Sequence, residues 1–144
     1  MRKKGFIGIK MLIIVSILNV LGTINVPSFL DRGSKEKTVL AKTAIDTYLK
    51  TGLDLYELDN GSYPSNDQGP SSLAKRPAVA PVPVDWRGPY VYNEELTRDP
   101  WGKPYTYVFP GKHNPKSYDL SSNGPDGQPG NNDDITNWKT EAGK

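Results

Sequence analysis

The longest apolar stretch of the chain lies near its start. A basic leader with Arg2, Lys3 and Lys4 ends at Gly5, and an apolar stretch then runs over residues 6–30. A helix rises about 1.5 Å per residue, so about twenty residues span the ~30 Å hydrocarbon core of a bilayer. The pattern predicts a transmembrane helix over residues 6–30, and the positive leader places the N-terminus in the cytoplasm and the bulk of the chain outside.

Three interpretations of this N-terminal segment are open. A cleaved secretory signal needs small residues at a site after the apolar region, and residues 22–28 offer only a poor one. A single-pass anchor fits the length. In the third, the step from Gly5 directly to Phe6 resembles the processing site of the type IV pilin-like family. That resemblance implies that a prepilin peptidase cuts between Gly5 and Phe6 and methylates the new N-terminal Phe6, leaving the apolar helix on the mature protein.

Two residues stand out within the apolar segment. Lys10 lies close to the cytoplasmic end, where its ammonium group can reach the headgroups at modest cost. In the pilin-like family, the matching position usually holds a glutamate that pairs with the N-terminal amine of a neighbouring subunit. The resemblance therefore assigns Lys10 to assembly, as a departure from the family pattern. Pro27 removes a backbone donor, which predicts a kink or unwound stretch over residues 25–28, or simply the membrane exit.

A second apolar periodicity follows the membrane segment. Between Lys35 and Leu58, apolar residues recur at spacings of three and four. They are Leu40, Ala41, Ala44, Ile45, Tyr48, Leu49, Leu53 and Tyr56. The pattern predicts an amphipathic helix over residues 31–60 whose apolar stripe covers a sheet. Gly61 is expected to end it in a positive-φ conformation, and Gly52 weakens it by ~1 kcal/mol relative to alanine, so its last two turns are expected to be the softest.

The remainder, residues 61–144, reads as one globular part with little helix. Six prolines between Gly61 and Tyr90 exclude a long helix there, so this is a long surface loop. Short β-rich runs at residues 90–92, 105–109 and 117–120 predict a small antiparallel sheet, with a tight turn at residues 99–102 between the first two. Trp86, Tyr90 and Tyr92 are expected to pin the loop to the core. The predicted fold class is α+β.

Composition narrows the function classes. Three of the cations behind the formal net charge of +2 lie in the leader, so the remaining chain is nearly neutral and no basic patch indicates nucleic acid. The chain has no cysteine and one histidine, His113, which excludes a disulfide framework and a zinc cluster. A membrane-anchored periplasmic hydrolase that uses the C-terminal aspartates stays a remote alternative, because no nucleophile and base occur at a persuasive spacing.

Several short motifs occur in one order along the chain. They are Leu58 to Pro64, Asp67-Gln68-Gly69, Asp99-Pro100-Trp101-Gly102 with Pro104-Tyr105, Gly124-Pro125-Asp126-Gly127, Asp133-Asp134-Ile135, and Asn137-Trp138. Together they resemble the major pseudopilins of type II secretion systems over nearly the whole chain. A type IV pilin for adhesion, motility or DNA uptake is the alternative, although such pilins commonly carry a C-terminal disulfide that this chain cannot form.

The resemblance implies a structural subunit and not an enzyme. It implies an inner-membrane protein with a periplasmic globular part, which assembles through its N-terminal helix into a short periplasmic filament that helps export folded proteins across the outer membrane. The implied partners are further copies of the chain, minor pseudopilins, the inner-membrane assembly platform and the prepilin peptidase.

The last expectation is a calcium site between residues 120 and 134. Asp126, Asp133 and Asp134 lie there among glycines, an oxygen-rich set of the kind that hard cations select. The spacing is not that of an EF-hand, and such a loop can also be an ordinary turn. The pseudopilin resemblance implies that the three aspartates bind calcium, with the backbone carbonyls of Ser122 and Asn123 completing the shell.

Overall fold

The computed structural model describes residues 26–140, with side chains from Gly33 onward. The leader, the cleavage site at Gly5 and Phe6, Lys10 and nearly all of the predicted span over residues 6–30 lie outside the described residues. Within the described part, no helix combines the length and apolar character needed to cross a membrane. From Ser34 onward the described residues form a compact unit of their own.

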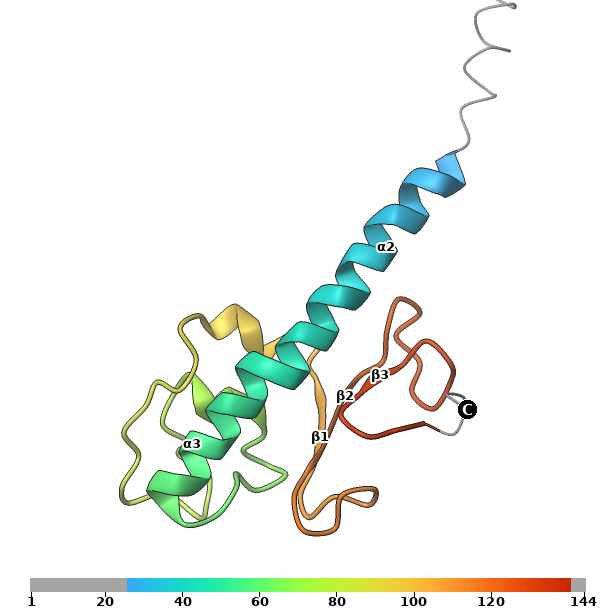
Figure 1. Ribbon diagram of the computed structural model, residues 1–144. Helices are drawn as coiled ribbons and strands as arrows, with labels where there is room; N and C mark the ends of the chain where they lie inside the picture. Colours follow the sequence, from blue (N-terminus) through green and yellow to red (C-terminus); the bar gives the residue numbers. More distant parts are fainter. Residues whose placement is uncertain (1–25, 141–144) are drawn as a thin grey trace, which may run out of the picture. The chain divides into compact units, whose positions relative to one another are not determined.

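Helical structure runs without a break from Val26 to Asn60 (Figure 1). It consists of α2 (Val26–Thr43), the π-helical turn η1 (Ala44–Leu49) and α3 (Lys50–Asn60). Gly61 ends α3 with a φ of 79°, and its N–H donates to the carbonyl of Glu57 at 2.7 Å. The predicted helix over residues 31–60 and its glycine end are confirmed. Residues 26–28 are helical, and the rest of the kink predicted around Pro27 lies outside the described residues.

The apolar stripe of this helix is narrower than the sequence pattern indicated. The buried members are Ala41, Ala44, Ile45, Leu49, Leu53 and Tyr56. Leu40 and Tyr48, predicted as part of the stripe, are 59% and 42% exposed. Successive residues are about 100° apart around a helix, so Leu40 and Tyr48 point away from the side on which Ala41 and Leu49 are buried. Tyr48 packs instead edge-on against Tyr92, with ring centres 6.1 Å apart.

A three-stranded antiparallel sheet lies beside the helix (Figure 1). Its strands are β1 (Thr106–Val108), β2 (Asp119–Ser122) and β3 (Ile135–Thr136), in the order β1-β2-β3. Tyr107 pairs with Leu120, and Ser121 pairs with Thr136. The predicted α+β class with a small antiparallel sheet is therefore confirmed.

The individual strands were predicted less well than the sheet. The prediction of a strand at residues 90–92 is wrong, since these residues form no strand. The N–H of Tyr90 donates to the carbonyl of Leu73 at 2.7 Å and not to a strand of the sheet. β2 begins two residues later than the run at 117–120, and β3 was not predicted at all. A two-residue strand carries too little periodicity to be recognised in a sequence.

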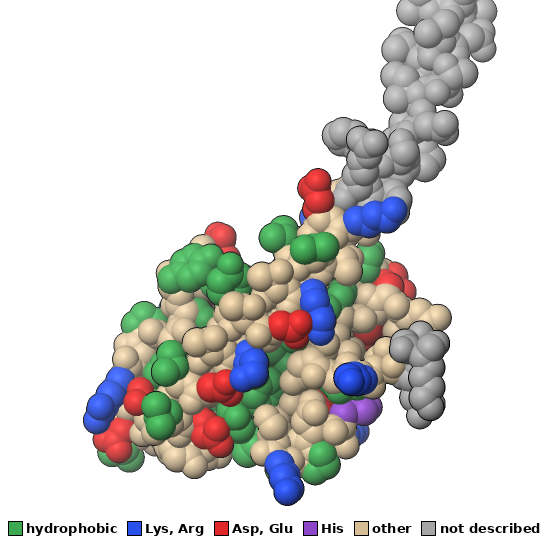
Figure 2. All heavy atoms as spheres, viewed as in Figure 1, with side chains coloured by type: hydrophobic (Ala, Val, Ile, Leu, Met, Phe, Trp, Pro, Cys, Tyr) green, Lys and Arg blue, Asp and Glu red, His purple; other side chains and the backbone are tan. Residues whose placement is uncertain are grey.

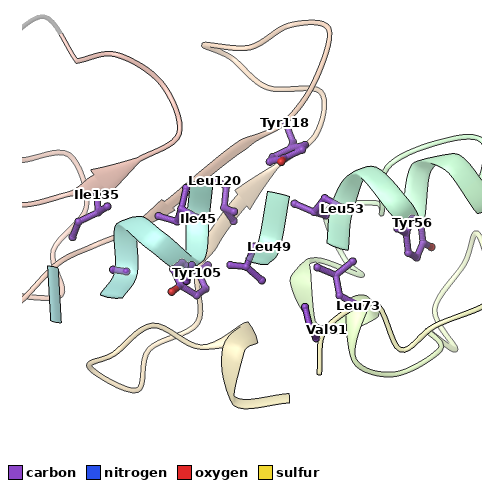
Figure 3. Packing of buried hydrophobic residues seen from close by; sticks show 12 residues of the cluster. Ile45, Leu49, Leu53, Tyr56, Leu73, Val91, Tyr105, Tyr118, Leu120 and Ile135 are labelled. Carbon is purple, nitrogen blue, oxygen red and sulfur yellow. The ribbon is translucent and has the colours of Figure 1, made fainter. Parts of the chain in front are cut away.

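Helix and sheet enclose one hydrophobic core (Figure 3). Leu49 and Leu53 on the helix and Leu120 on β2 are all fully buried. Gly52 has a packing role that helix propensity did not indicate. A β-carbon there would lie 3.1 Å from the Cδ1 atom of Leu73 and 3.2 Å from the carbonyl oxygen of Tyr90. The glycine therefore allows the neighbouring segments to approach the helix closely.

The proline-rich loop is fixed by polar groups of buried and half-buried side chains. Trp86 donates its indole N–H to the carbonyl of Ser72 at 2.9 Å, and Tyr90 donates its hydroxyl to Asp59 at 2.9 Å. Gln68, 5% exposed, donates to the carbonyls of Val79 and Pro81. The prediction that Trp86 and Tyr90 hold the loop is confirmed. It was wrong for Tyr92, which is 81% exposed.

Two short 3₁₀ helices lie in the connecting segments, η2 (Pro70–Leu73) and η3 (Glu94–Thr97). The predicted tight turn at residues 99–102 is also present. Gly102 donates its N–H to the carbonyl of Asp99 at 2.8 Å and has a φ of 81°. Arg98 and Pro104, on either side of the turn, form an isolated antiparallel β-bridge. The turn therefore does not connect two strands of the sheet, contrary to the prediction from the sequence.

Candidate functional site

The predicted calcium residues lie in the connection between the last two strands. We call residues 123–134 the β2–β3 loop; it forms the red-orange loop near the C-terminus in Figure 1. Ser122 and Ile135 pair across the antiparallel strands at its two ends. The loop is therefore closed at its base by the sheet.

The three aspartates organise the loop through hydrogen bonds. The Asp126 carboxylate accepts the N–H of Gln128 at 2.8 Å and the Asn131 side-chain amide at 2.7 Å. Asp133 Oδ2 accepts the N–H of Asp126 at 3.2 Å, which brings these two predicted site residues together. Asp134 Oδ2 accepts the N–H of Gly130 at 2.7 Å. Each carboxylate thus holds part of the loop backbone.

Gly124 lies where the two ends of the loop touch. Its φ of 65° belongs to the left-handed region, which favours glycine. A β-carbon at Gly124 would overlap the carbonyl oxygen of Asp133 and would lie 2.9 Å from the Asp133 carboxylate oxygen Oδ2. The lack of a side chain at Gly124 therefore allows the backbone and carboxylate of Asp133 to pack against the start of the loop.

The oxygen-rich loop holds one carboxylate oxygen that no group in the described part of the chain engages. Asp134 Oδ1 is buried and has no hydrogen-bond partner in the structure, which is unfavourable for a carboxylate oxygen unless another group engages it. No group of three or more histidine, cysteine, aspartate or glutamate side chains gathers in a metal-binding arrangement within residues 26–140. A calcium shell here would therefore need backbone carbonyls besides the carboxylates, as calcium sites commonly have.

A buried carboxylate outside the loop contacts Ser122, the last residue of β2 before the loop begins. Asp99 is 5% exposed, and its Oδ2 accepts the hydroxyl of Ser122 at 2.6 Å. Its Oδ1 accepts the N–H groups of Trp101 at 3.1 Å and Lys103 at 2.8 Å. Burial, together with the Asp99 charge, raises the pKa of the nearby Tyr105 hydroxyl. The sequence identified Asp99 only as the first residue of a turn, because its partner Ser122 lies on a distant strand.

A second buried carboxylate, Asp119, organises a different segment. It is 4% exposed and accepts the N–H groups of Lys112, His113 and Asn114. Burial alone would raise the pKa of the Asp119 carboxyl, but the hydrogen bonds from His113 and its neighbours lower it below the usual value. His113 therefore helps to hold the Asp119 carboxylate in place. The His113 ring also stacks on the Trp138 ring, with ring centres 4.2 Å apart.

Acidic and basic side chains are interspersed on the face of the molecule shown in Figure 2. Two of the ion pairs on the helix join residues four apart, Lys42 with Asp46 and Lys50 with Asp54. All four of these side chains are about half exposed, so solvent screens each pair and it adds little to stability.

The helix packed on a small antiparallel sheet places this chain in the pilin-like class of filament subunits, because the fold matches that of a pseudopilin of known structure. One solved structure is the major pseudopilin from the type 2 secretion system of enterohaemorrhagic Escherichia coli. Its match to this chain has a TM-score of 0.65 and 35% sequence identity, and it covers 81% of this chain and 94% of that one.

The particular family follows from two sequence comparisons. The family described as type II secretion system (T2SS), protein G, matches residues 28–138. The type II secretion system core protein G of Escherichia coli K12 is 39% identical over 95% of this chain and 92% of its own length. That of Pseudomonas aeruginosa PAO1 is 39% identical over 95% and 96%. The chain belongs to the type II secretion system protein G family.

Family membership decides between the alternatives raised by the sequence. The chain is a structural subunit of the type II secretion pseudopilus. It is not an enzyme, so the periplasmic hydrolase is excluded as its function. The acidic loop is therefore to be understood as part of a filament subunit and not as a catalytic site.

Proposed function

We propose that this subunit is held in the inner membrane by a helix over residues 6–30, with its globular part in the periplasm. A prepilin peptidase cleaves between Gly5 and Phe6 and methylates Phe6. The mature chain then assembles through its N-terminal helix into a periplasmic filament that helps export folded proteins across the outer membrane. The observation that carries this proposal is 39% identity to a core protein G over 95% of the chain, a share that includes most of the N-terminal apolar segment.

The proposed partners are further copies of the chain, the minor pseudopilins, the inner-membrane assembly platform and the prepilin peptidase. Lys10 distinguishes this chain from the family pattern, because an ammonium group cannot pair with the N-terminal amine of a neighbour. Apolar contacts between N-terminal helices would then contribute more of the assembly energy.

We also propose that the β2–β3 loop binds a calcium ion. The proposed ligands are Asp126, Asp133 and Asp134, together with the backbone carbonyls of Ser122 and Asn123. The three carboxylates do not form a metal-binding group in the described residues, so calcium would draw them together on binding. The partnerless Asp134 Oδ1 and the close packing of Asp133 on Gly124 support this assignment. When bound, calcium supplies positive charge that offsets the repulsion among the three carboxylates. Exported calcium modules bind at ~10⁻⁴ to 10⁻³ M, and ion at about ten times that constant would add ~1.4 kcal/mol to the unfolding free energy.

The secretion role is tested in a deletion strain. We expect type II substrates to accumulate in the periplasm, because the outer-membrane step lacks its filament, while pilus-dependent motility is unchanged. Complementation with the intact chain restores secretion. Normal secretion together with lost motility would contradict the proposal and would favour a type IV pilin function.

A further inference from the structure

A short chain of hydrogen bonds connects the turn at residues 99–102 to the β2–β3 loop. Gly124 donates its N–H to the Ser122 hydroxyl oxygen at 3.2 Å, and that hydroxyl donates to Asp99 Oδ2 at 2.6 Å. We call these three residues the Asp99 brace. The shorter distance is typical of a hydroxyl bound to an ionised carboxylate, which is one of the stronger hydrogen bonds in proteins.

All three residues of the Asp99 brace are buried. Ser122 has no exposed surface, Asp99 is 5% exposed, and Gly124 is also buried. The opposite carboxylate oxygen, Oδ1, is held by the N–H groups of Trp101 and Lys103. Because one oxygen of Asp99 is fixed by the turn, the other provides a fixed acceptor for Ser122. Water cannot easily replace an acceptor in this position, so its loss leaves a buried hydroxyl unsatisfied.

The brace acts on the part of the loop that matters for ion binding. Ser122 and Asn123 carry the two backbone carbonyls proposed as ligands, and Gly124 packs against the proposed ligand Asp133. The brace spans this segment from Ser122 to Gly124. It therefore fixes the start of the loop relative to the aspartates at its end.

We propose that Asp99 is a positioning residue for the calcium loop, acting through Ser122 and Gly124 without contacting the ion. This inference rests on the calcium binding proposed above. Asp99 fixes the loop before the ion arrives, so that binding does not have to order the segment from Ser122 to Gly124. A residue that only stabilised the fold would change the melting temperature without changing the calcium affinity of the folded protein.

Asp99→Asn separates these two roles. Asparagine keeps the size of the side chain, and its one oxygen can still accept the N–H groups of Trp101 and Lys103. Its amide group then faces the Ser122 hydroxyl and cannot accept the hydroxyl proton. The turn is preserved, but the Ser122 hydroxyl loses its charged acceptor, because the amide group can only donate to it. We expect the dissociation constant for calcium to rise about tenfold, as loss of a hydrogen bond to a charged group predicts.

The chain offers a matched control in Asp119→Asn. Asp119 is an equally buried aspartate that braces backbone N–H groups, but those groups belong to residues 112–114. Both variants are expected to melt at lower temperature in chelator. Only Asp99→Asn is expected to weaken calcium binding, measured by calorimetric titration of the full chain in detergent micelles.

The outcomes are distinct. An intact chain that does not bind calcium overturns the proposed calcium site and this inference with it. Calcium binding by Asp99→Asn that is as tight as in the intact chain overturns only the positioning role. Equal weakening by Asp99→Asn and Asp119→Asn also overturns it, because general destabilisation would then explain both. If Asp99→Asn does not fold, Ser122→Ala makes the same test, since alanine keeps the backbone carbonyl and removes the hydroxyl.

Discussion

Alanine in place of Gly124 is expected to abolish the rise in melting temperature that the proposed calcium site predicts for the intact chain. The new methyl group would overlap the carbonyl oxygen of Asp133, and the residue would have to keep a φ of 65°. The left-handed conformation alone costs ~1–2 kcal/mol for alanine, and the backbone collision adds to it. We expect the unfolding free energy to fall by about 3 kcal/mol and the loop to lose the arrangement that we propose for calcium binding.

Gly127→Ala is the matched control for this substitution. Gly127 also has a positive φ, 70°, but a β-carbon there would have nothing within 4 Å. The control therefore carries the conformational strain without the collision. Melting is followed by tryptophan fluorescence in calcium, in magnesium and in chelator. We expect the intact chain and Gly127→Ala to melt higher in calcium, with magnesium a poor substitute. A Gly124→Ala protein with the full calcium response would contradict this account of the loop.

Leu53→Ala is expected to destabilise the fold strongly. Leu53 has no exposed surface and packs in the core between helix and sheet (Figure 3). Truncating a buried leucine removes its transfer free energy and leaves a cavity, which together cost about 3 kcal/mol or more. Urea denaturation of the purified protein gives the change in unfolding free energy.

Leu55→Ala is the control, because it makes the same leucine-to-alanine truncation at an exposed position. Leu55 lies two residues further along the same helix but is 44% exposed, so its truncation leaves little cavity. We expect a loss of less than about 1 kcal/mol for this variant. Similar losses at the two positions would show that Leu53 is not in the core, and the helix orientation described above would be wrong.

The sequence predicted the elements that rest on local rules. The helix end at Gly61 follows from the conformational freedom of glycine, and the turn at 99–102 follows from its proline and glycine. The apolar spacing also identified the buried helix face around Ile45 and Leu49. It included Leu40 wrongly, because spacings of three and four define a broader arc than the sheet covers.

Features that depend on distant partners were not predictable in this way. Tyr90 has strong β propensity, but its backbone bonds to Leu73 and keeps it out of the sheet. The β3 strand exists because Ile135 and Thr136 pair with β2, although they have no strand pattern of their own.

In the candidate site, too, the sequence indicated local features and missed those that depend on distant partners. Asp126, Asp133 and Asp134 were predicted as ligands because they lie in one oxygen-rich loop and match the pseudopilin pattern, and they stay a prediction. The role of Gly124 depends on its contact with Asp133, and that of Asp99 on its hydrogen bond to Ser122. Both contacts are set by the packing of the sheet, so only the structure could place them.

The most direct test of the central claim, that this chain is a processed pseudopilin anchored by its N-terminal helix, is the intact mass and N-terminal sequence of the protein purified from membranes. The account predicts a chain that begins at a methylated Phe6 and retains the apolar segment over residues 6–30. A chain that still begins at Met1, or one cut within residues 22–28, would contradict it.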